Sequence, residues 1–170
     1  TLNRMAALII TVLKYILERN SMKARVFRTH PDAIIPSRKS DEAAGYDIHC
    51  LEDFTMRPGH RYTAKTGLVI QPDPGYHIEV LARSGLAHKF GIMLTNNVGL
   101  IDRDYAGPKD ELHIMLYMVP DSNPKLKAEF KKGDRVAQLV FRKTELADFE
   151  EVTAAPLDID RGGLGSTGVK

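Results

Sequence analysis

The sequence predicts an all-β fold, a distorted jelly-roll-like β-barrel or sandwich, for residues 22–160. Short extended runs recur roughly every eight to twelve positions, as is typical of such folds. The segments between them are rich in glycine, proline, aspartate and asparagine, which favour turns. Inside Tyr76–Ala82, Ile78 and Val80 share one face while His77, Glu79 and Leu81 share the other, as expected for a half-buried strand.

The elements follow from these runs in chain order. The predicted strands are Tyr46–Cys50, Tyr62–Ile70, Tyr76–Ala82, Gly91–Leu94, Leu112–Val119 and Arg135–Phe141. Turn formers separate them, for example in 72–75 and 132–134. Only Lys125–Phe130 is typical of a short helical turn.

Residues 1–21 differ from the rest of the chain because their apolar residues follow a helical spacing. We expect an added N-terminal amphipathic α-helix here, with two adjacent apolar stripes. The stripes contain Leu2, Met5, Ile9, Val12 and Ile16, and Ala6, Ile10, Leu13 and Leu17. The apolar run 5–17 is shorter than the about 20 residues that span a bilayer, and Lys14 interrupts it. We hypothesise that residues 1–21 are an extension of the β domain or a fusion to it. The apolar helix would then pack either on its own domain or on another chain.

Bulk composition excludes several classes of function. The 170 residues contain 24 Lys and Arg against 22 Asp and Glu, a net charge of +2, which argues against nucleic acid or an anionic membrane as a partner. The single cysteine, Cys50, excludes an internal disulfide framework and favours the reducing cytoplasm. The six histidines form no pair at metal-ligand spacing, and no nucleophile elbow is present.

Two polar clusters in the first half of the chain could carry chemistry. Ala43–Asp47 is a glycine bend that leads into a strand with a carboxylate at its start. In 82–87, Arg83, Ser84 and Gly85 place a guanidinium, a hydroxyl and a flexible backbone side by side. This combination suits phosphate, since arginine donates in a fork and glycine permits close approach. Taken alone, each cluster is also an ordinary turn.

A third cluster spans 96–107. An apolar strand there ends in Asp102 and Asp104, followed by Tyr105, and glycines lie on both sides. A carboxylate at the end of a strand can orient and deprotonate water. A polar hairpin without chemistry is the alternative.

The last two clusters are 132–139 and 161–168. The former is a tight turn that enters a core strand carrying Gln138, and we expect most of it to be structural. The latter nearly matches a P-loop, but Val169 stands where the lysine belongs and the sequence leaves no room for the helix that a P-loop requires. Two interpretations of 161–168 are left: a glycine-rich arm that closes over phosphates, or a C-terminal tail without a function.

In order and spacing, the five clusters resemble the five motifs of the trimeric dUTP pyrophosphatases (dUTPases), from Ala43 to Gly168. The resemblance implies a jelly-roll-like fold and a homotrimer with three sites at the subunit interfaces. It also implies hydrolysis of dUTP to dUMP and pyrophosphate with Mg²⁺.

The resemblance assigns a role to individual residues. Asp102 would be the general base that activates water for attack on the α-phosphorus. Tyr105 would lie under the deoxyribose. Asp47 would contact magnesium through water. The uracil edge would be read by Asn96 and by the backbone of Gly99, Leu100 and Ile101. The phosphates would be held by Arg83, Ser84, Gly85 and Gln138, and the closing arm would supply Arg161, Leu164, Gly165, Ser166 and Thr167.

The fifth motif departs from the family pattern in two ways. It is two residues shorter, and Leu164 stands where a phenylalanine normally stacks on the base. Base–aromatic stacking is worth about 1–3 kcal/mol. We therefore expect weaker substrate binding or looser closure of the arm, without loss of chemistry, and the phosphate contact of Arg161 is in question.

Two other functions remain open. The related dCTP deaminases share the fold but use a glutamate near the third motif, where this chain has Asp102. A catalytically weakened β-trimer that serves as a scaffold or regulatory binder, with the N-terminal helix making the contacts, is the other alternative.

Overall fold

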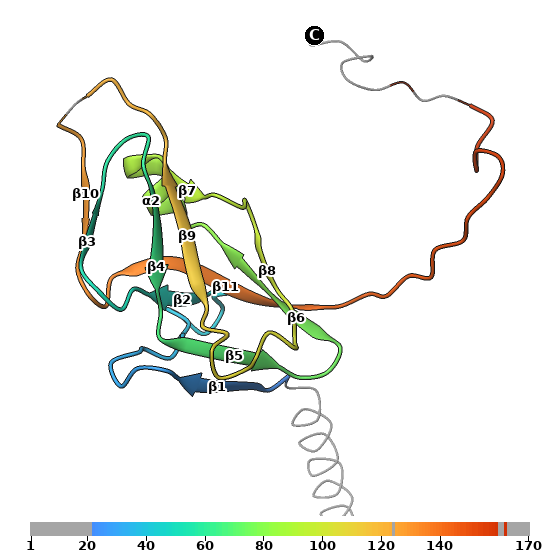
Figure 1. Cartoon of the computed structure of the whole chain (residues 1–170), viewed down its shortest axis with the longest axis horizontal. Helices are drawn as coiled ribbons and strands as arrows, with labels where there is room; N and C mark the ends of the chain where they lie inside the picture. Colours follow the sequence, from blue (N-terminus) through green and yellow to red (C-terminus); the bar gives the residue numbers. More distant parts are fainter. Residues whose placement is uncertain (1–21, 124, 160–161, 163–170) are drawn as a thin grey trace, which may run out of the picture.

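The computed structural model describes residues 22–123, 125–159 and 162 (Figure 1). The predicted N-terminal helix lies outside these residues. The strands and the helix of the described residues are β1 (Ala24–Arg28), β2 (Tyr46–His49), β3 (Phe54–Met56), β4 (Arg61–Lys65), β5 (Leu68–Pro72), β6 (Tyr76–Leu81), α2 (Ser84–Phe90), β7 (Ile92–Leu94), β8 (Gly99–Ile101), β9 (His113–Met118), β10 (Ala128–Phe130) and β11 (Arg135–Lys143). The all-β prediction is confirmed.

The strands form four antiparallel sheets. The largest has the order β2-β11-β6-β8, a second has the order β4-β9-β7, and β1-β5 and β3-β10 are pairs. Within the described residues these sheets pack against one another without closing into a continuous ring, so the barrel part of the prediction is wrong. Edge strands β2 and β8 remain on either side of the largest sheet.

Alternating side chains from the facing sheets form the core. In β9, Ile114, Leu116 and Met118 are buried while the residues between them are more exposed. In β6, Ile78 and Val80 are buried as the sequence predicts. This period of two is what places one face of a strand in the core and the other in solvent.

One predicted strand, Tyr62–Ile70, is interrupted. The chain leaves β4 at Lys65 and enters β5 at Leu68, and Gly67 between them has a φ of 69°. A side chain at Gly67 would be 2.9 Å from Cβ of Ala33. Only glycine suits this backbone and this close approach, so the apolar run contains a bend that its composition conceals.

The helical prediction for Lys125–Phe130 is wrong, and α2 was not predicted. Ala128 and Phe130 point into the core from β10, which pairs with β3. Phe130 stacks on Phe54 with ring centroids 4.4 Å apart, and Phe54 stacks on Tyr62 at 4.0 Å. Three-residue strands are too short for a periodicity to be read from sequence, and here the aromatic contacts favour the extended form.

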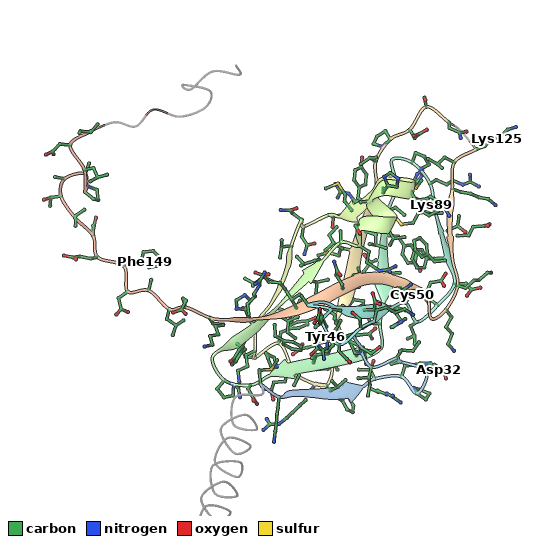
Figure 2. All side chains as sticks on the ribbon, turned by 180° about the vertical axis from the view of Figure 1, so that it is seen from behind. Asp32, Tyr46, Cys50, Lys89, Lys125 and Phe149 are labelled. Atoms are coloured by element: carbon green, nitrogen blue, oxygen red, sulfur yellow. The ribbon has the colours of Figure 1, made fainter. Side chains whose placement is uncertain are left out.

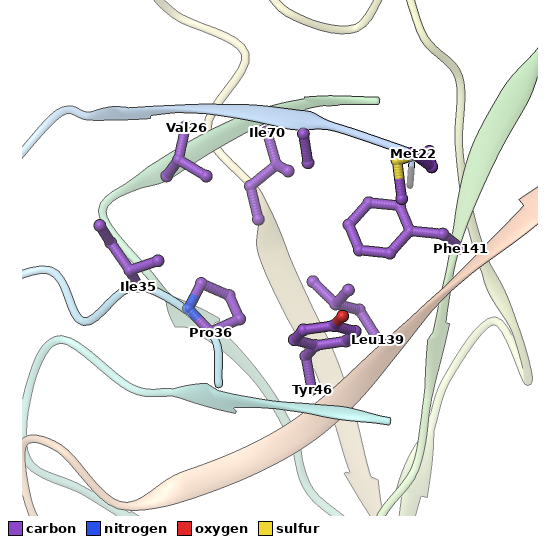
Figure 3. A pocket seen from close by; sticks show the side chains of 9 residues that line it. Met22, Val26, Ile35, Pro36, Tyr46, Ile70, Leu139 and Phe141 are labelled. Atoms are coloured by element: carbon purple, nitrogen blue, oxygen red, sulfur yellow. The ribbon is translucent and has the colours of Figure 1, made fainter. Parts of the chain in front are cut away.

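An apolar pocket lies between the β1-β5 pair and the β2-β11 side of the largest sheet (Figure 3). Its lining is Met22, Ala24, Val26, Ile35, Pro36, Tyr46, Ile70, Leu139 and Phe141. No charged side chain is among these residues, so this pocket is unsuited to a triphosphate. No helix in the described part of the chain has the length and apolar content that crossing a bilayer requires.

Candidate functional site

A polar cavity of about 380 Å³ brings together residues from the first, second and fourth predicted motifs. Strand register explains their meeting, because Gln138 of β11 lies opposite Asp47 of β2 on one side and Leu81 of β6 on the other. The chain leaves β6 two residues before Arg83, and α2 begins at Ser84. The lining is Lys39, Ala43, Ala44, Gly45, Asp47, Arg83, Ser84, Gly85, Arg135 and Gln138.

Asp47 organises the arginines of this cavity. Its Oδ1 lies 3.3 Å from Nε of Arg83, and its Oδ2 accepts a hydrogen bond of 3.0 Å from Arg135. Arg83 also donates to the carbonyl of Arg135 at 3.2 Å. The side chain of Asp47 is 15% exposed, so this is a largely buried charge that needs its partners. The carboxylate thereby holds both guanidiniums in a fixed geometry.

Gly45 and Gln138 are in close contact. A Cβ at Gly45 would lie 2.8 Å from Oε1 of Gln138, so no larger residue fits without moving the amide. The amide group of Gln138 donates to the carbonyl of Ala82 at 3.2 Å, which fixes its orientation beside Arg83. The glycine of the first motif and the glutamine of the fourth are thus parts of one arrangement.

The third motif connects β7, which pairs with β9, to β8, which pairs with β6 in the largest sheet. Asn97 in its turn has a φ of 61°, and Asn96 is exposed. A Cβ at Gly99 would lie 3.1 Å from Cβ of Val80 and 3.4 Å from the side-chain nitrogen of Asn96. Glycine at this position therefore permits the close approach of β8 to β6. Leu100 is exposed and Ile101 is half-buried.

Asp102 follows β8 directly and is exposed, and the turn after it is closed by a bond from the amide of Tyr105 to its carbonyl. Tyr105 is 41% exposed and donates its hydroxyl to the carbonyl of Glu111 at 3.3 Å. Asp102 and Leu100 line a second pocket with Gly75, Tyr76, His77, Arg103, Thr144 and Leu146.

The two groups of predicted residues lie far apart on one chain. The pocket of Asp102 shares no residue with the polar cavity. Asp47 and Asp102 are on the two edges of the β2-β11-β6-β8 sheet, three strand intervals or about 14 Å apart across it. The strand register also places Asp102 four residues further along the strand direction than Asp47, which is about 13 Å. The backbone positions of Asp47 and Asp102 are therefore about 20 Å apart. A single triphosphate cannot contact both groups.

Two residues of the polar cavity were not predicted as functional. Arg135 lies inside a segment that sequence reasoning treats as structural, and its role follows only from its bond to Asp47, 88 positions away. Lys39 lines the same cavity from the irregular segment before β2. In the sequence, only the position of Lys39 shortly before the glycine bend of the first motif could have suggested a functional role, and that signal is weak.

Burial and positive charge around this cavity also act on its neighbours. The pKa of His49 lies below its ordinary value, mainly because burial disfavours the charged ring, and the guanidiniums of Arg135 and Arg83 act in the same direction. Burial likewise raises the pKa of the Cys50 thiol, so Cys50 is an unreactive core residue.

No group of three or more histidine, cysteine, aspartate or glutamate side chains that could hold a metal ion exists among the described residues. Both carboxylate oxygens of Asp47 already contact Arg83 and Arg135, so Asp47 does not suit direct ligation of a metal ion, and any contact with one would run through water. Arg161, Leu164, Gly165, Ser166 and Thr167 lie outside the described residues.

An antiparallel β fold with an arginine, glycine and amide cavity is typical of a protein that binds a small anionic molecule. The chain belongs to the dUTPase family, whose model matches residues 31–168. It is 38% identical over 149 residues to the deoxyuridine 5′-triphosphate nucleotidohydrolase of Nautilia profundicola, covering 86% of this chain and 99% of that protein.

Solved structures share this fold, and two phage proteins are examples. The dUTPase of Staphylococcus bacteriophage 80alpha with dUPNHPP matches with a TM-score of 0.72 and 24% identity, covering 86% of this chain and 99% of that one. A mutant of the dUTPase from phage phi11 of S. aureus, described with a structural Mg(II) ion, has a TM-score of 0.69 and 21% identity, covering 78% and 97%.

Proposed function

We propose that this protein hydrolyses dUTP to dUMP and pyrophosphate, in a homotrimer whose active sites are shared between subunits, and that it acts in the cytoplasm. Membership of the dUTPase family supports the reaction. The separation of Asp102 from the polar cavity carries the proposal of shared sites, because the two groups can serve one substrate only if different subunits supply them.

The polar cavity binds the phosphates in this proposal. Arg83 uses its Nε and one N–H of the guanidinium within the protein, which leaves other N–H groups for phosphate oxygens. Ser84 and Gly85 open α2, whose start has no side-chain cap, so backbone amides there also remain available. The amide of Gln138, held beside Arg83 by its bond to the carbonyl of Ala82, assists.

Asp102 is the general base. An exposed carboxylate directly after a strand takes a proton from water, and that water attacks the α-phosphorus while pyrophosphate leaves. Tyr105 offers its ring to the deoxyribose, and Asn96 with the backbone of Gly99, Leu100 and Ile101 reads the uracil. A site that pairs with the donors and acceptors of uracil rejects cytosine strongly.

Mg²⁺ is the expected cofactor. Asp47 would contact the hydrated ion through water, with triphosphate oxygens as its main ligands. The bound ion supplies neutralisation of charge on the leaving pyrophosphate. The arm with Arg161, Leu164, Gly165, Ser166 and Thr167 would close over the nucleotide from a neighbouring subunit.

An exposed apolar segment also favours an assembly. After β11 the chain runs away from the body, and Phe149 on it is 100% exposed (Figures 1 and 2). Leu146, Leu157 and Ile159 are 91%, 78% and 83% exposed. Apolar side chains gathered in this way normally contact another molecule, and a second copy of this chain fits that need.

Pyrophosphate release from dUTP with Mg²⁺ tests the reaction, with Asp102→Asn as the inactive control. Absence of release from the wild-type protein would favour the scaffold alternative, and ammonia release from dCTP would favour the deaminase.

Mixed subunits test the shared sites. Asp102→Asn and Arg83→Ala chains, each inactive alone, are unfolded together and refolded as mixed trimers. Some sites then combine an intact Asp102 with an intact Arg83, so activity returns. If the mixture stays as inactive as the separate variants, the sites are not shared.

A further inference from the structure

Glu111 carries a dense set of contacts that the proposed chemistry does not use. Its Oε1 accepts hydrogen bonds from two successive backbone amides, Thr66 at 3.1 Å and Gly67 at 2.9 Å. Its Oε2 accepts one from the hydroxyl of Thr29 at 3.3 Å. The side chain is 19% exposed, so these bonds are largely protected from water. A carboxylate held by two amides and a hydroxyl is firmly fixed.

The partner of Glu111 is the break between β4 and β5. Gly67 has a φ of 69°, and successive amides next to a left-handed residue form a concave anion site. The packing of Gly67 against Ala33 keeps this backbone in place. The anion that occupies this site is the side chain of Glu111. The break in the predicted strand therefore provides the two amides that bind the Glu111 carboxylate.

Backbone bonds strengthen the same junction. The buried hydroxyl of Thr66 donates to the carbonyl of Leu112 at 2.7 Å, and the amide of Leu112 donates to the carbonyl of Leu68 at 2.7 Å. Residues 111–112 are therefore joined to residues 66–68 by both main chain and side chain.

The loop 102–110 ends at this junction. It begins at Asp102, directly after β8, and the hydroxyl of Tyr105 donates to the carbonyl of Glu111 at 3.3 Å. Asp110 accepts a bond from the amide of Gly107 at 2.7 Å, which closes the loop just before Glu111. The position of Tyr105 thus depends on where Glu111 is held.

We propose that Glu111 is a positioning residue, which anchors the loop 102–110 on the β4–β5 break and thereby sets the platform that selects deoxyribose over ribose. This rests on the proposed function, in which Tyr105 lies under the sugar. Glu111 touches no substrate. It acts through the carbonyl that receives the Tyr105 hydroxyl and through the end of the loop.

The test compares Glu111→Ala and Glu111→Gln with Glu129→Ala in the full chain. Glutamine keeps an acceptor for the two amides but loses the charge, so it should rescue part of the effect. Glu129 is an exposed carboxylate on β10, paired with Lys127 far from the loop in sequence, and serves as the matched control. The ratio of kcat/KM for dUTP to kcat/KM for UTP is measured below the unfolding temperature of every variant.

We expect the ratio to fall about tenfold in Glu111→Ala, less in Glu111→Gln, and to stay unchanged in Glu129→Ala, since a misplacement of about 1 Å can cost up to about a hundredfold in rate. A smaller folded fraction lowers both rates equally and leaves the ratio unchanged. A wild-type ratio in both Glu111 variants would therefore overturn the proposal.

Hydrogen exchange at the amides of Tyr105 and Ala106 is a second readout that needs no activity. Their exchange should accelerate about tenfold in Glu111→Ala while the amides of β9 remain as protected as in the wild type. If the wild-type protein does not hydrolyse dUTP, the proposed function fails and the exchange rates alone decide whether Glu111 anchors the loop. Unchanged exchange at these two amides would refute the anchoring.

Discussion

Gly45→Ala tests whether the polar cavity depends on the contact between its first and fourth motifs. The added methyl group would lie 2.8 Å from Oε1 of Gln138, and the amide must retreat to at least the 3.4 Å of an ordinary contact. Because the obstacle is the end of a flexible side chain, the fold can accommodate it. The retreat breaks the bond from Gln138 to Ala82, which is worth about 0.5–1.5 kcal/mol.

This magnitude predicts a mild change in stability and a larger one in activity. For a chain of this size, about 1 kcal/mol lowers Tm by about 2–4 °C. We expect kcat/KM for dUTP to fall about tenfold, because a displaced amide no longer meets the phosphates. Calorimetry and pyrophosphate release measure the two effects.

A double-mutant cycle supplies the control. In a Gln138→Ala background only the Cβ of residue 138 remains near the methyl group, at 3.5 Å, which is an ordinary contact, so Gly45→Ala should cost little more there. If it costs as much as in the wild-type background, the contact with Gln138 is not the cause and the reasoning is wrong.

Three further predictions concern other parts of the chain. Leu164→Phe should raise kcat/KM for dUTP, by restoring a stacking contact of about 1–3 kcal/mol, and an unchanged value would contradict this. Phe54→Ala should lower the free energy of unfolding in urea by about 3–5 kcal/mol, since Phe54 stacks on both Phe130 and Tyr62, and a loss below about 1 kcal/mol would contradict the stacking argument. The lowered pKa of His49 means that the unfolded chain binds its proton at a higher pH than the folded chain. Stability should therefore fall as the pH decreases below about 6.5, and His49→Gln should reduce this fall in urea titrations at about pH 7.5 and 5.5.

Much of the fold could be predicted because its longer strands carry their own pattern. Strands such as Tyr76–Leu81 and His113–Met118 show burial with a period of two. Short elements carry no such pattern: Phe54–Met56 and Ala128–Phe130 are strands because they pair with each other. The helix Ser84–Phe90 ends at Gly91, a left-handed cap, but its sequence lacks an acidic residue or cap at its start that would have indicated it.

Sequence can propose candidate site residues where residue type and local order suffice, but not where a residue acts through a distant partner. Arg83, Gly85 and Asp102 could be proposed as candidates from residue type and from the order of their motifs. Arg135 and Glu111 could not, because each acts on a group that only the fold brings near. Glu111 meets Thr66 and Gly67 across 45 and 44 positions, and Pro108–Glu111 resembles an ordinary loop insertion in sequence.

The balance of charge in the polar cavity explains how a nearly neutral chain can bind a triphosphate. Lys39, Arg83 and Arg135 are three cations, and Asp47 is the one carboxylate among the residues that line the cavity. Asp47 reduces the local positive charge, yet it aligns both guanidiniums before any ligand arrives, so less conformational freedom is lost on binding. Asp47→Asn would raise the positive charge and still weaken phosphate binding if alignment dominates. If attraction by net charge dominates, the same substitution would tighten it. The inhibition constant of pyrophosphate distinguishes the two, and the paired geometry of Asp47 leads us to expect weaker binding.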